Sequence, residues 1–449
     1  MPLQPFEGEV TSLLSDLIRF DTTNPPGNET EAADFLAGSL GKDGFDCKVF
    51  ESAVGRGSIV TRLEGMGEKP SLLLLSHLDV VAAKAEEWSV DPFGGVVRDG
   101  FVWGRGALDM KGMTAIEAMT MKLLKRNNVK LKGDVLLAAT ADEEKGGFAG
   151  VDYLLRNHRE EVFADYVLNE GGGLGIPTQN RNVFTVQTAE KGILWLRIRA
   201  KGVPGHGSTP DAGDNAITRM SRVIERLGSY KQLVVLVPTV RRFLEEISRE
   251  DVILQGYVSR LLAHPERSDE ILDELAVTEK VLADEIRPRI RMTILPTMIS
   301  GGVKENVIPS ECEATFDCRV LPGQTTAQAL ELVKGLLMDV GFAKLSFEIV
   351  QVNEPSESPV ETPLYDVITG VLRDFEPGCG VTPVLMTGGT DSRFFRQLGS
   401  VCYGFHPMRP ETASGKIERR EHGIDERISV ENLVFGTNVL YEVVKRFMT

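Results

Sequence analysis

The sequence is poor in several features that would point to particular classes of protein. Its 449 residues include only five cysteines, scattered and without a CxxC pair, which favours reduced thiols over a disulfide framework. No apolar run approaches the roughly eighteen residues that span a membrane, and the amino terminus is acidic where a signal peptide is basic. These absences predict a soluble, cytoplasmic protein without disulfides or a membrane partner.

Basic residues and histidine are also in short supply. Fifty Lys and Arg stand against sixty-five Asp and Glu, which gives a formal net charge of −15 at pH 7. Because basic surface drives binding to polyphosphates, this balance argues against a nucleic acid partner. Six histidines are available as metal ligands or for acid and base chemistry.

The first 190 residues alternate short apolar runs with amphipathic helical stretches. The runs at 72–75, 135–139 and 166–168 are expected to be buried strands, and an apolar period of about 3.6 residues predicts a helix over 113–125. This alternation is typical of α/β architecture with a mostly parallel sheet.

The pattern changes near Gly192 and changes back after about residue 354. Between these points the chain shows alternating strand patterns, amphipathic helices and a long charged helical stretch over 240–286. These features predict a separate α+β module. We therefore expect a discontinuous α/β domain, formed by residues 1–191 and 355–449, with residues 192–354 inserted as a lid.

Two polar residues in the first domain could serve a site, although each has a simpler explanation. In SHLDVV, Asp79 follows His77 by two residues, so its carboxylate can orient the imidazole. A structural histidine explains this segment alone equally well. In GRGALDMKG, Asp109 precedes a predicted helix, and a helix cap is the better explanation of that residue alone.

Further acidic residues follow strand-like runs. Glu143 and Glu144 stand among three adjacent acids in ADEEKGG, and Glu170 precedes three glycines in NEGGG. Adjacent carboxylates repel each other, which a solvated loop tolerates. In an open α/β sheet, however, the binding site lies in the crevice beyond such strand ends. His422 lies far downstream, in a polar stretch ahead of the final predicted helix.

Taken together, these segments predict a metal site. Most of them follow strands of the same predicted sheet, so their side chains can converge on one edge. Clustered carboxylates in a partly dry crevice are costly unless cations neutralise them. Two histidines with three carboxylates suit two Zn²⁺ ions or similar divalent metals, and one acid remains for proton transfer.

A series of segments over nearly the whole chain is similar to a known family. In order, they are SHLDVV, GRGALDMKG, ADEEKGG, NEGGG, GVPGHGSTP, GGVKENVIP, DCRVLPG, TGGTDSR and HGIDE. Together they resemble the acetylornithine deacetylase, succinyl-diaminopimelate desuccinylase and carboxypeptidase family of dinuclear zinc peptidases and amidohydrolases. The resemblance implies a zinc-peptidase type of catalytic domain, with residues 192–354 as a lid and dimerisation domain.

The resemblance also implies a ligand set for two Zn²⁺ ions per subunit, with Co²⁺ or Mn²⁺ as substitutes. One ion would be held by His77, Asp109 and Glu170, and the other by Asp109, Glu144 and His422. Asp109 would then bridge the two ions. Glu143 would be the general base, and Asp79 would orient His77. The peptide bond after Asp109 is expected to be cis.

Residues of the lid and of the last segment receive roles by the same resemblance. His206 is expected to reach across a homodimer into the partner's site and to help stabilise the oxyanion. Four residues are expected to bind the substrate, the first two through its carboxylate: Asn306, Arg319, Gly389 and Thr390. His406 is a second late histidine, but the family motif fits His422, so we expect His406 to support the site or the fold.

The implied reaction is hydrolysis of an amide bond next to a free carboxylate, in a small acyl amino acid or short peptide. A hydroxide that bridges the metals would attack, with Glu143 as general base. Deacetylase, desuccinylase and carboxypeptidase activities remain open, and a dinuclear zinc dipeptidase is an alternative that Glu170, in place of Asp, disfavours. A metal-binding protein without catalysis is the alternative of another class, and the presence of Glu143 beside a complete ligand set argues against it.

Overall fold

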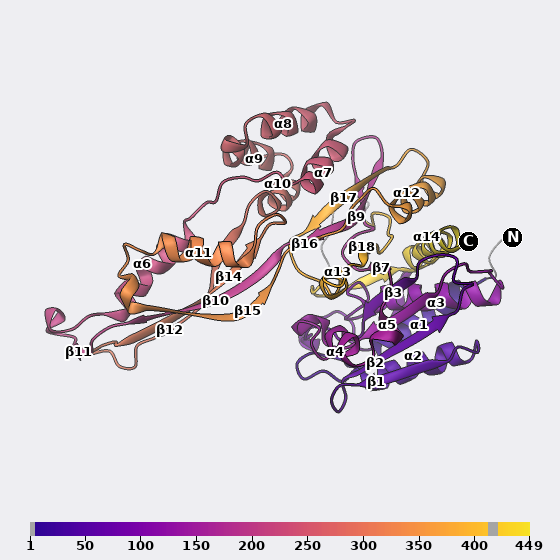
Figure 1. Ribbon diagram of the computed structural model, residues 1–449, viewed down its shortest axis with the longest axis horizontal. Coiled ribbons are helices and arrows are strands. Elements are labelled where there is room, and N and C mark those ends of the chain that lie inside the picture. The colour runs from indigo at the N-terminus through magenta and orange to yellow at the C-terminus, as the bar shows by residue number, and fades with distance from the viewer. Residues whose placement is uncertain (1–4, 412–420) are drawn as a thin grey trace.

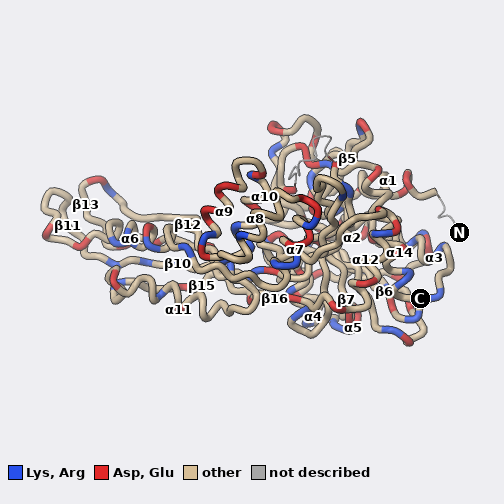
Figure 2. Tube along the Cα trace, turned by 90° about the horizontal axis from the view of Figure 1, so that it is seen from above, with Lys and Arg blue, Asp and Glu red and all other residues tan. Residues whose placement is uncertain are grey.

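The computed structural model describes residues 5–411 and 421–449. Figure 1 shows a long arm that projects from a larger, layered body. Lys and Arg alternate with Asp and Glu over arm and body alike (Figure 2). The two parts are built on different sheets, and the chain passes from body to arm and back again.

A ten-stranded sheet forms the centre of the body. Eight strands follow one another across it: β1 (Cys47–Glu51), β2 (Gly57–Leu63), β6 (Val135–Thr140), β3 (Leu72–His77), β7 (Tyr166–Asn169), β18 (Val401–Gly404), β9 (Asn182–Glu190) and β16 (Ser356–Glu357). Two more pair with β9: β8 (Gly175–Pro177) and β17 (Gly380–Met386). The middle of the sheet, from β6 to β18, is parallel.

Helices cover both faces of this sheet. One face is packed by α1 (Glu7–Ile18), α2 (Thr30–Gly41), α3 (Lys111–Arg126), α12 (Pro363–Phe375) and α14 (Val430–Met448). The other is packed by α4 (Val151–Asn157), α5 (Arg159–Val162) and α13 (Ser392–Arg396). Alternate leucines of β3 pack on opposite layers, which explains why the run is apolar at every position. No helix within 5–411 and 421–449 has both the length and the apolar character needed to cross a membrane.

The arm is a four-stranded antiparallel sheet. Its strands lie in the order β12 (Thr293–Gly301), β14 (Glu311–Val320), β10 (Gly192–Lys201) and β15 (Leu345–Asn353). Helices α6 (Ala216–Gly228) and α11 (Thr326–Leu336) pack on it, and their first turns are capped by the side chains of Asn215 and Thr325. The predicted α/β fold with a mostly parallel sheet and an inserted α+β lid is therefore confirmed.

The charged stretch over 240–286 is helical, as expected, but it is divided into several helices. It forms four helices: α7 (Pro238–Ser248), α8 (Val252–Ala263), α9 (Ser268–Ala276) and α10 (Lys280–Ile286). The side chain of Asp251 caps the start of α8, and Pro265 follows the end of that helix. Phe243 and Leu244 of α7 share a core with residues of β9 and β17. This helical insertion therefore packs against the body's sheet.

One further carboxylate is buried inside the body, on helix α3. Glu117 of α3 is fully buried, and neither of its oxygens has a hydrogen-bond partner within the described residues. Burial raises the pKa of Glu117 well above its usual value. An ionised carboxylate at this position would be costly, so the folded chain favours the neutral form.

We expect Glu117→Met to raise the free energy of unfolding at pH 8 by at least about 1 kcal/mol and to change it little near pH 5. The unfolded carboxyl ionises above about pH 4.5, whereas the folded one stays neutral until its raised pKa, so the wild type loses stability over that interval. Urea unfolding at both pH values measures the difference.

Glu266→Met provides the control, because it replaces an exposed carboxylate. It should show no difference from the wild type that grows with pH. A Glu117→Met effect of the same size at pH 5 and pH 8 would contradict the assignment of a buried, neutral carboxyl.

Candidate metal centre

The carboxyl ends of three neighbouring strands bring a histidine and several acids to one edge of the large sheet. His77 is the last residue of β3, Glu143 and Glu144 lie just beyond β6, and Glu170 follows β7 directly. Strand β3 lies between β6 and β7 and is parallel to both. These side chains therefore start from the same edge, as the position of strand ends in an open sheet requires.

A second, smaller sheet brings Asp109 and His422 to the same edge. A small sheet of β4 (Val96–Arg98), β5 (Phe101–Trp103) and β19 (Arg427–Ser429) joins the segments that carry them. The backbone N–H groups of Leu108 and Asp109 donate to the buried carboxylate of Glu426, at 2.8 and 3.0 Å. Arg105 donates to its other oxygen at 2.6 Å. The peptide bond between Asp109 and Met110 is cis, as expected.

The two histidines face the two oxygens of Asp109. His77 Nε2 lies 3.0 Å from Asp109 Oδ1 and 3.8 Å from Glu170 Oε2. His422 Nε2 lies 3.0 Å from Asp109 Oδ2 and 3.1 Å from Glu144 Oε1. The structure thus places four of the five predicted ligands around the carboxylate of the fifth, Asp109.

The donor set fits divalent metal ions. Ligand atoms of His77, Asp109 and Glu144 lie within 4.8 Å of one another, and so do those of His77, Glu143 and Glu170. Imidazole nitrogen and carboxylate oxygen are ordinary ligands of Zn²⁺ and of other transition metals. A carboxylate with one oxygen toward each histidine is suited to bridge two ions.

Burial and mutual repulsion shift the pKa values of these groups. Burial, with the charge of Glu170, raises the pKa of Glu143 well above its usual value, and burial also raises the pKa of Glu170. Hydrogen bonds to Asp109 and a second carboxylate raise the pKa of His422 to about 10. Burial alone would lower the pKa of His77, but hydrogen bonds to carboxylates raise it well above its usual value. Without metal, protons on the histidines offset part of the negative charge.

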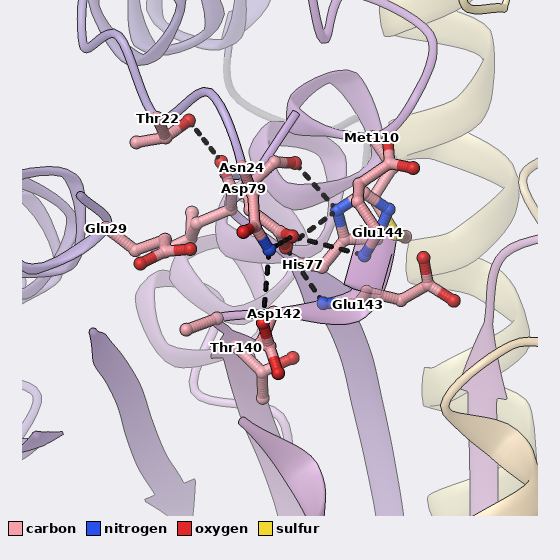
Figure 3. A network of polar contacts seen from close by, with 12 residues as sticks. Thr22, Asn24, Glu29, His77, Asp79, Met110, Thr140, Asp142, Glu143 and Glu144 are labelled. Carbon is pink, nitrogen blue, oxygen red and sulfur yellow. Dashed lines mark hydrogen bonds and ion pairs between the residues drawn. The ribbon is translucent and has the colours of Figure 1, made fainter. Parts of the chain in front are cut away.

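Asp79 lies behind His77 and the loop that follows β6 (Figure 3). Its carboxylate accepts hydrogen bonds from the backbone N–H groups of Glu143 and Glu144, at 3.0 and 3.1 Å. Asn24 donates to it at 2.8 Å. The Nδ1 atom of His77 lies 2.9 Å from the Asp79 carbonyl oxygen and 3.5 Å from its carboxylate. The Asp79 backbone therefore makes the closer contact with the ring, and its carboxylate fixes the Glu143 loop.

The structure does not bring the predicted lid residues His206 and Asn306 close to the candidate metal ligands of the same chain. His206 and Asn306 lie together at the far end of the arm, where β11 (Gly205–His206) pairs with β13 (Val307–Ile308) (Figure 1). The N–H of Gly207 donates to the Asn306 carbonyl at 2.8 Å. The Nδ1 atom of His206 lies 2.7 Å from the Ser208 hydroxyl.

Three further predicted residues lie near the junction of arm and body. Arg319 of β14 makes two hydrogen bonds to Asp317, at 2.8 and 3.0 Å. Gly389 lies beside Ile193 of β10. The hydroxyl and the N–H of Thr390 both donate to the buried carboxylate of Glu190. Both donors of Thr390 are thereby engaged within the protein.

His406 is buried but belongs to neither group of metal-ligating atoms. Burial lowers the pKa of His406 to about 4, and its Nε2 atom has no hydrogen-bond partner in the part of the chain that the structure describes. It is thus a neutral imidazole near the centre.

Sequence reasoning missed several residues that hold the centre in place. Arg105 and Glu426 form a buried ion pair between two of the quoted motifs, and their opposite charges were the available signal. Asn24 gave no such signal, because its contacts are 55 and 118 residues away along the chain.

Known proteins are similar to this chain over most of its length. A family model described as "Peptidase family M20/M25/M40" matches residues 73–446. The chain is 29% identical over 421 residues to "N-fatty-acyl-amino acid synthase/hydrolase PM20D1" of Mus musculus, covering 88% of this chain and 79% of that protein. It is 28% identical over 412 residues to "Aminoacylase-1" of Sus scrofa, covering 90% of this chain and 88% of that protein.

A solved structure shares the fold. The M20 family metallo-carboxypeptidase Sso-CP2 from Sulfolobus solfataricus superposes with a TM-score of 0.73 and 18% identity, covering 98% of this chain and 99% of that one. At that level of identity the likeness concerns the fold alone.

Removing one buried charge tests whether the centre binds divalent cations. We expect Glu170→Gln to raise the melting temperature of the metal-free protein, because burial disfavours the carboxylate that glutamine replaces. The increase that Zn²⁺ or Mn²⁺ produces in the wild type should fall by at least about half, since a ligand stabilises according to its affinity. Thermal scans in EDTA and with each metal measure both effects.

The exposed Glu266 again provides the control, as Glu266→Gln. It should alter neither the metal-free melting temperature nor the response to metal. If Glu170→Gln responds to metal as fully as the wild type, the centre does not use this carboxylate as a ligand.

Proposed function

This chain belongs to peptidase family M20/M25/M40, and from that membership we propose that it hydrolyses an amide bond next to a free carboxylate. As a member of the family it is an enzyme, a metal-dependent amidohydrolase. The single observation that carries the proposal is the gathering of four candidate ligands around the fifth, Asp109, with Glu143 beside them. The proposed substrates are small acyl amino acids or short peptides.

We assign two Zn²⁺ ions to the centre, which Co²⁺ or Mn²⁺ could replace. His77, Asp109 and Glu170 would hold one ion, and Asp109, Glu144 and His422 the other. Bound there, the metals would polarise the substrate carbonyl and make a water molecule more acidic.

Glu143 is the acid left over for proton transfer. Its carboxylate lies within 4.8 Å of ligand atoms of His77 and Glu170, so it can reach a molecule held between them. It would take a proton from the attacking water and then give it to the leaving nitrogen. The hydrogen bond from its backbone N–H to Asp79 fixes where the side chain starts.

We propose that the arm serves a second copy of the chain. His206 would stabilise the oxyanion in the partner's site, and Asn306 would contact the substrate there. Support comes from the distance of both residues from their own centre (Figure 1). Among the described residues, strand β12 pairs only with β14 and exposes the apolar side chains of Leu295, Met298 and Ile299, so this sheet edge could join a second copy.

Enclosure of the substrate would involve the junction of arm and body. Arg319 offers a guanidinium that suits a planar carboxylate, Gly389 lies beside Ile193 of β10, and Thr390 follows Gly389 directly. The alternative of a dipeptidase uses the same centre, so only the substrate separates these activities.

A panel of substrates tests the reaction. The wild type with Zn²⁺ should hydrolyse at least one class among N-acetyl amino acids, N-succinyl diamino acids and unblocked dipeptides. Glu143→Gln should lower kcat on that substrate by at least about 100-fold, the usual scale for loss of a general base, with metal content unchanged. Rates and elemental analysis are measured on the same preparations.

Glu266→Gln should retain the wild-type rate. If no member of the panel is hydrolysed, the proposed substrate class is wrong. If Glu143→Gln keeps its rate, the role given to Glu143 is wrong.

A mixed dimer tests whether His206 of one subunit acts in the site of the other. A heterodimer of Glu143→Gln with His206→Ala, isolated through two different tags, contains one site with both Glu143 and a partner histidine. It should therefore recover about half of the wild-type activity, while each homodimer stays nearly inactive. A heterodimer as inactive as its parents would show that His206 does not act across subunits.

A further inference from the structure

The residue before Glu143 has a backbone conformation that L-amino acids rarely adopt. Asp142 has φ of 74°, in the left-handed region. Its carbonyl oxygen accepts a hydrogen bond from the N–H of Gly147 at 2.6 Å, and its Oδ2 atom accepts one from the N–H of Ala149 at 2.9 Å. Asp142 thus closes the loop that carries Glu143 and Glu144. Such a conformation persists only where the surroundings hold it.

The other carboxylate oxygen of Asp142 is held from the opposite side. Arg56 Nη2 donates to Asp142 Oδ1 at 2.9 Å, and Asn24 Nδ2 donates to it at 3.1 Å. Figure 3 shows Asn24 between Asp142 and Asp79. Two connected contacts therefore fix the loop, one through Asp79 to the backbone of Glu143 and one through Asp142.

Arg56 is itself fixed in one orientation. Its Nε and Nη2 atoms donate to the two oxygens of Glu29, each at 2.9 Å, and Glu29 is fully buried. Gly27 leaves room for the guanidinium, because a Cβ atom there would lie 2.5 Å from Arg56 Cζ. A planar guanidinium can bind Glu29 and Asp142 at once, and the ammonium of a lysine cannot reproduce that geometry.

Arg56 also supplies positive charge to a buried group of acids. Glu29, Asp142 and Asp79 lie in one connected set of hydrogen bonds, and each is buried. A buried carboxylate that loses its cation is strongly unfavourable. Without Arg56, the Asp142 carboxylate would keep the N–H of Ala149 and the amide of Asn24 but lose its cation, so the left-handed conformation would be held less firmly.

We propose that Arg56 is a positioning residue for the reaction. It acts through Asp142 on the backbone of Glu143 and so aims the general base, without touching metal or substrate. The inference rests on the proposed function, because it assumes that Glu143 transfers the proton.

Kinetics of Arg56→Met provide the first test. We expect kcat to fall by about 10- to 100-fold, since a misplacement of about 1 Å at a catalytic group has this effect. KM should change by less than about 3-fold because the substrate contacts remain. Arg56→Lys should recover only part of the rate. Gly27→Ala, which keeps every charge but displaces the guanidinium, should also lower kcat.

Arg181→Met is the matched control. Arg181 pairs with Glu246 at 2.9 Å, and its side chain is 13% exposed, against 14% for Arg56. It lies away from the metal centre, so kcat should stay within about twofold of the wild type. An equal loss of kcat in both variants would assign the effect to general destabilisation and overturn the proposal.

A double variant separates positioning from a structural role. In the Glu143→Gln background, adding Arg56→Met should lower the residual rate by less than about twofold, because the group through which Arg56 acts is already gone. If the two losses multiply in full, Arg56 does not act through Glu143 and the proposal fails.

Hydrogen exchange tests the inference without any substrate. In Arg56→Met and Gly27→Ala, the backbone amides of Glu143, Glu144 and Ala149 should exchange faster than in the wild type and in Arg181→Met. Unchanged protection of these amides would overturn the inference even if no substrate of the panel is hydrolysed. If the wild type is active and Arg56→Met has the same kcat, the inference about Arg56 is wrong but the proposed function is unaffected.

Discussion

Carboxylates that lie a few ångströms apart in a partly buried site repel one another, and this chain places Asp109, Glu143, Glu144 and Glu170 in such a position. The body of the protein resists that repulsion with rigid parts. Parallel strands fix where the loops begin, and the buried carboxylates of Asp79 and Glu426 bind the backbone N–H groups of the loops themselves. The carboxylates therefore stay close together although they repel one another, and their combined negative charge can bind cations. A metal-dependent amidohydrolase requires such a site.

Hydrophobic patterns in the sequence predict the strands whose burial depends on their own residues. The runs that form β3, β6 and β7 are apolar at nearly every position because helices cover both faces of the sheet, and their acidic ends are visible in the sequence. Strand β14 occupies the predicted alternating stretch, since one face packs on α6 and α11 while the other is more open. The candidate ligands could therefore be named, although their convergence depends on strand order.

Contacts between distant segments could not be predicted in this way. Arg56 meets Asp142 across 86 residues, and no period or motif marks two polar residues that become neighbours only when the sheet is complete. The hydroxyl of Thr390 donates to Glu190, which is 200 residues away, and no pattern in the sequence marks this contact. The helices α7 to α10 looked like one charged stretch because the apolar residues that they bury in one core with β9 and β17 are spread over all four helices.

The far end of the arm has a consequence for natural variation among related chains. Strands β11 and β13 contribute no residue to the hydrophobic core clusters of the described chain. Except at Ile308, which is buried against Gly205 and Gly213, amino acid changes in this tip therefore carry little penalty for folding, whereas changes beside β3 or β6 disturb close packing. Selection could thus alter the chemistry that one copy offers to its neighbour while the metal-binding body stays constant, and new substrate preferences could arise from the least constrained part of the molecule.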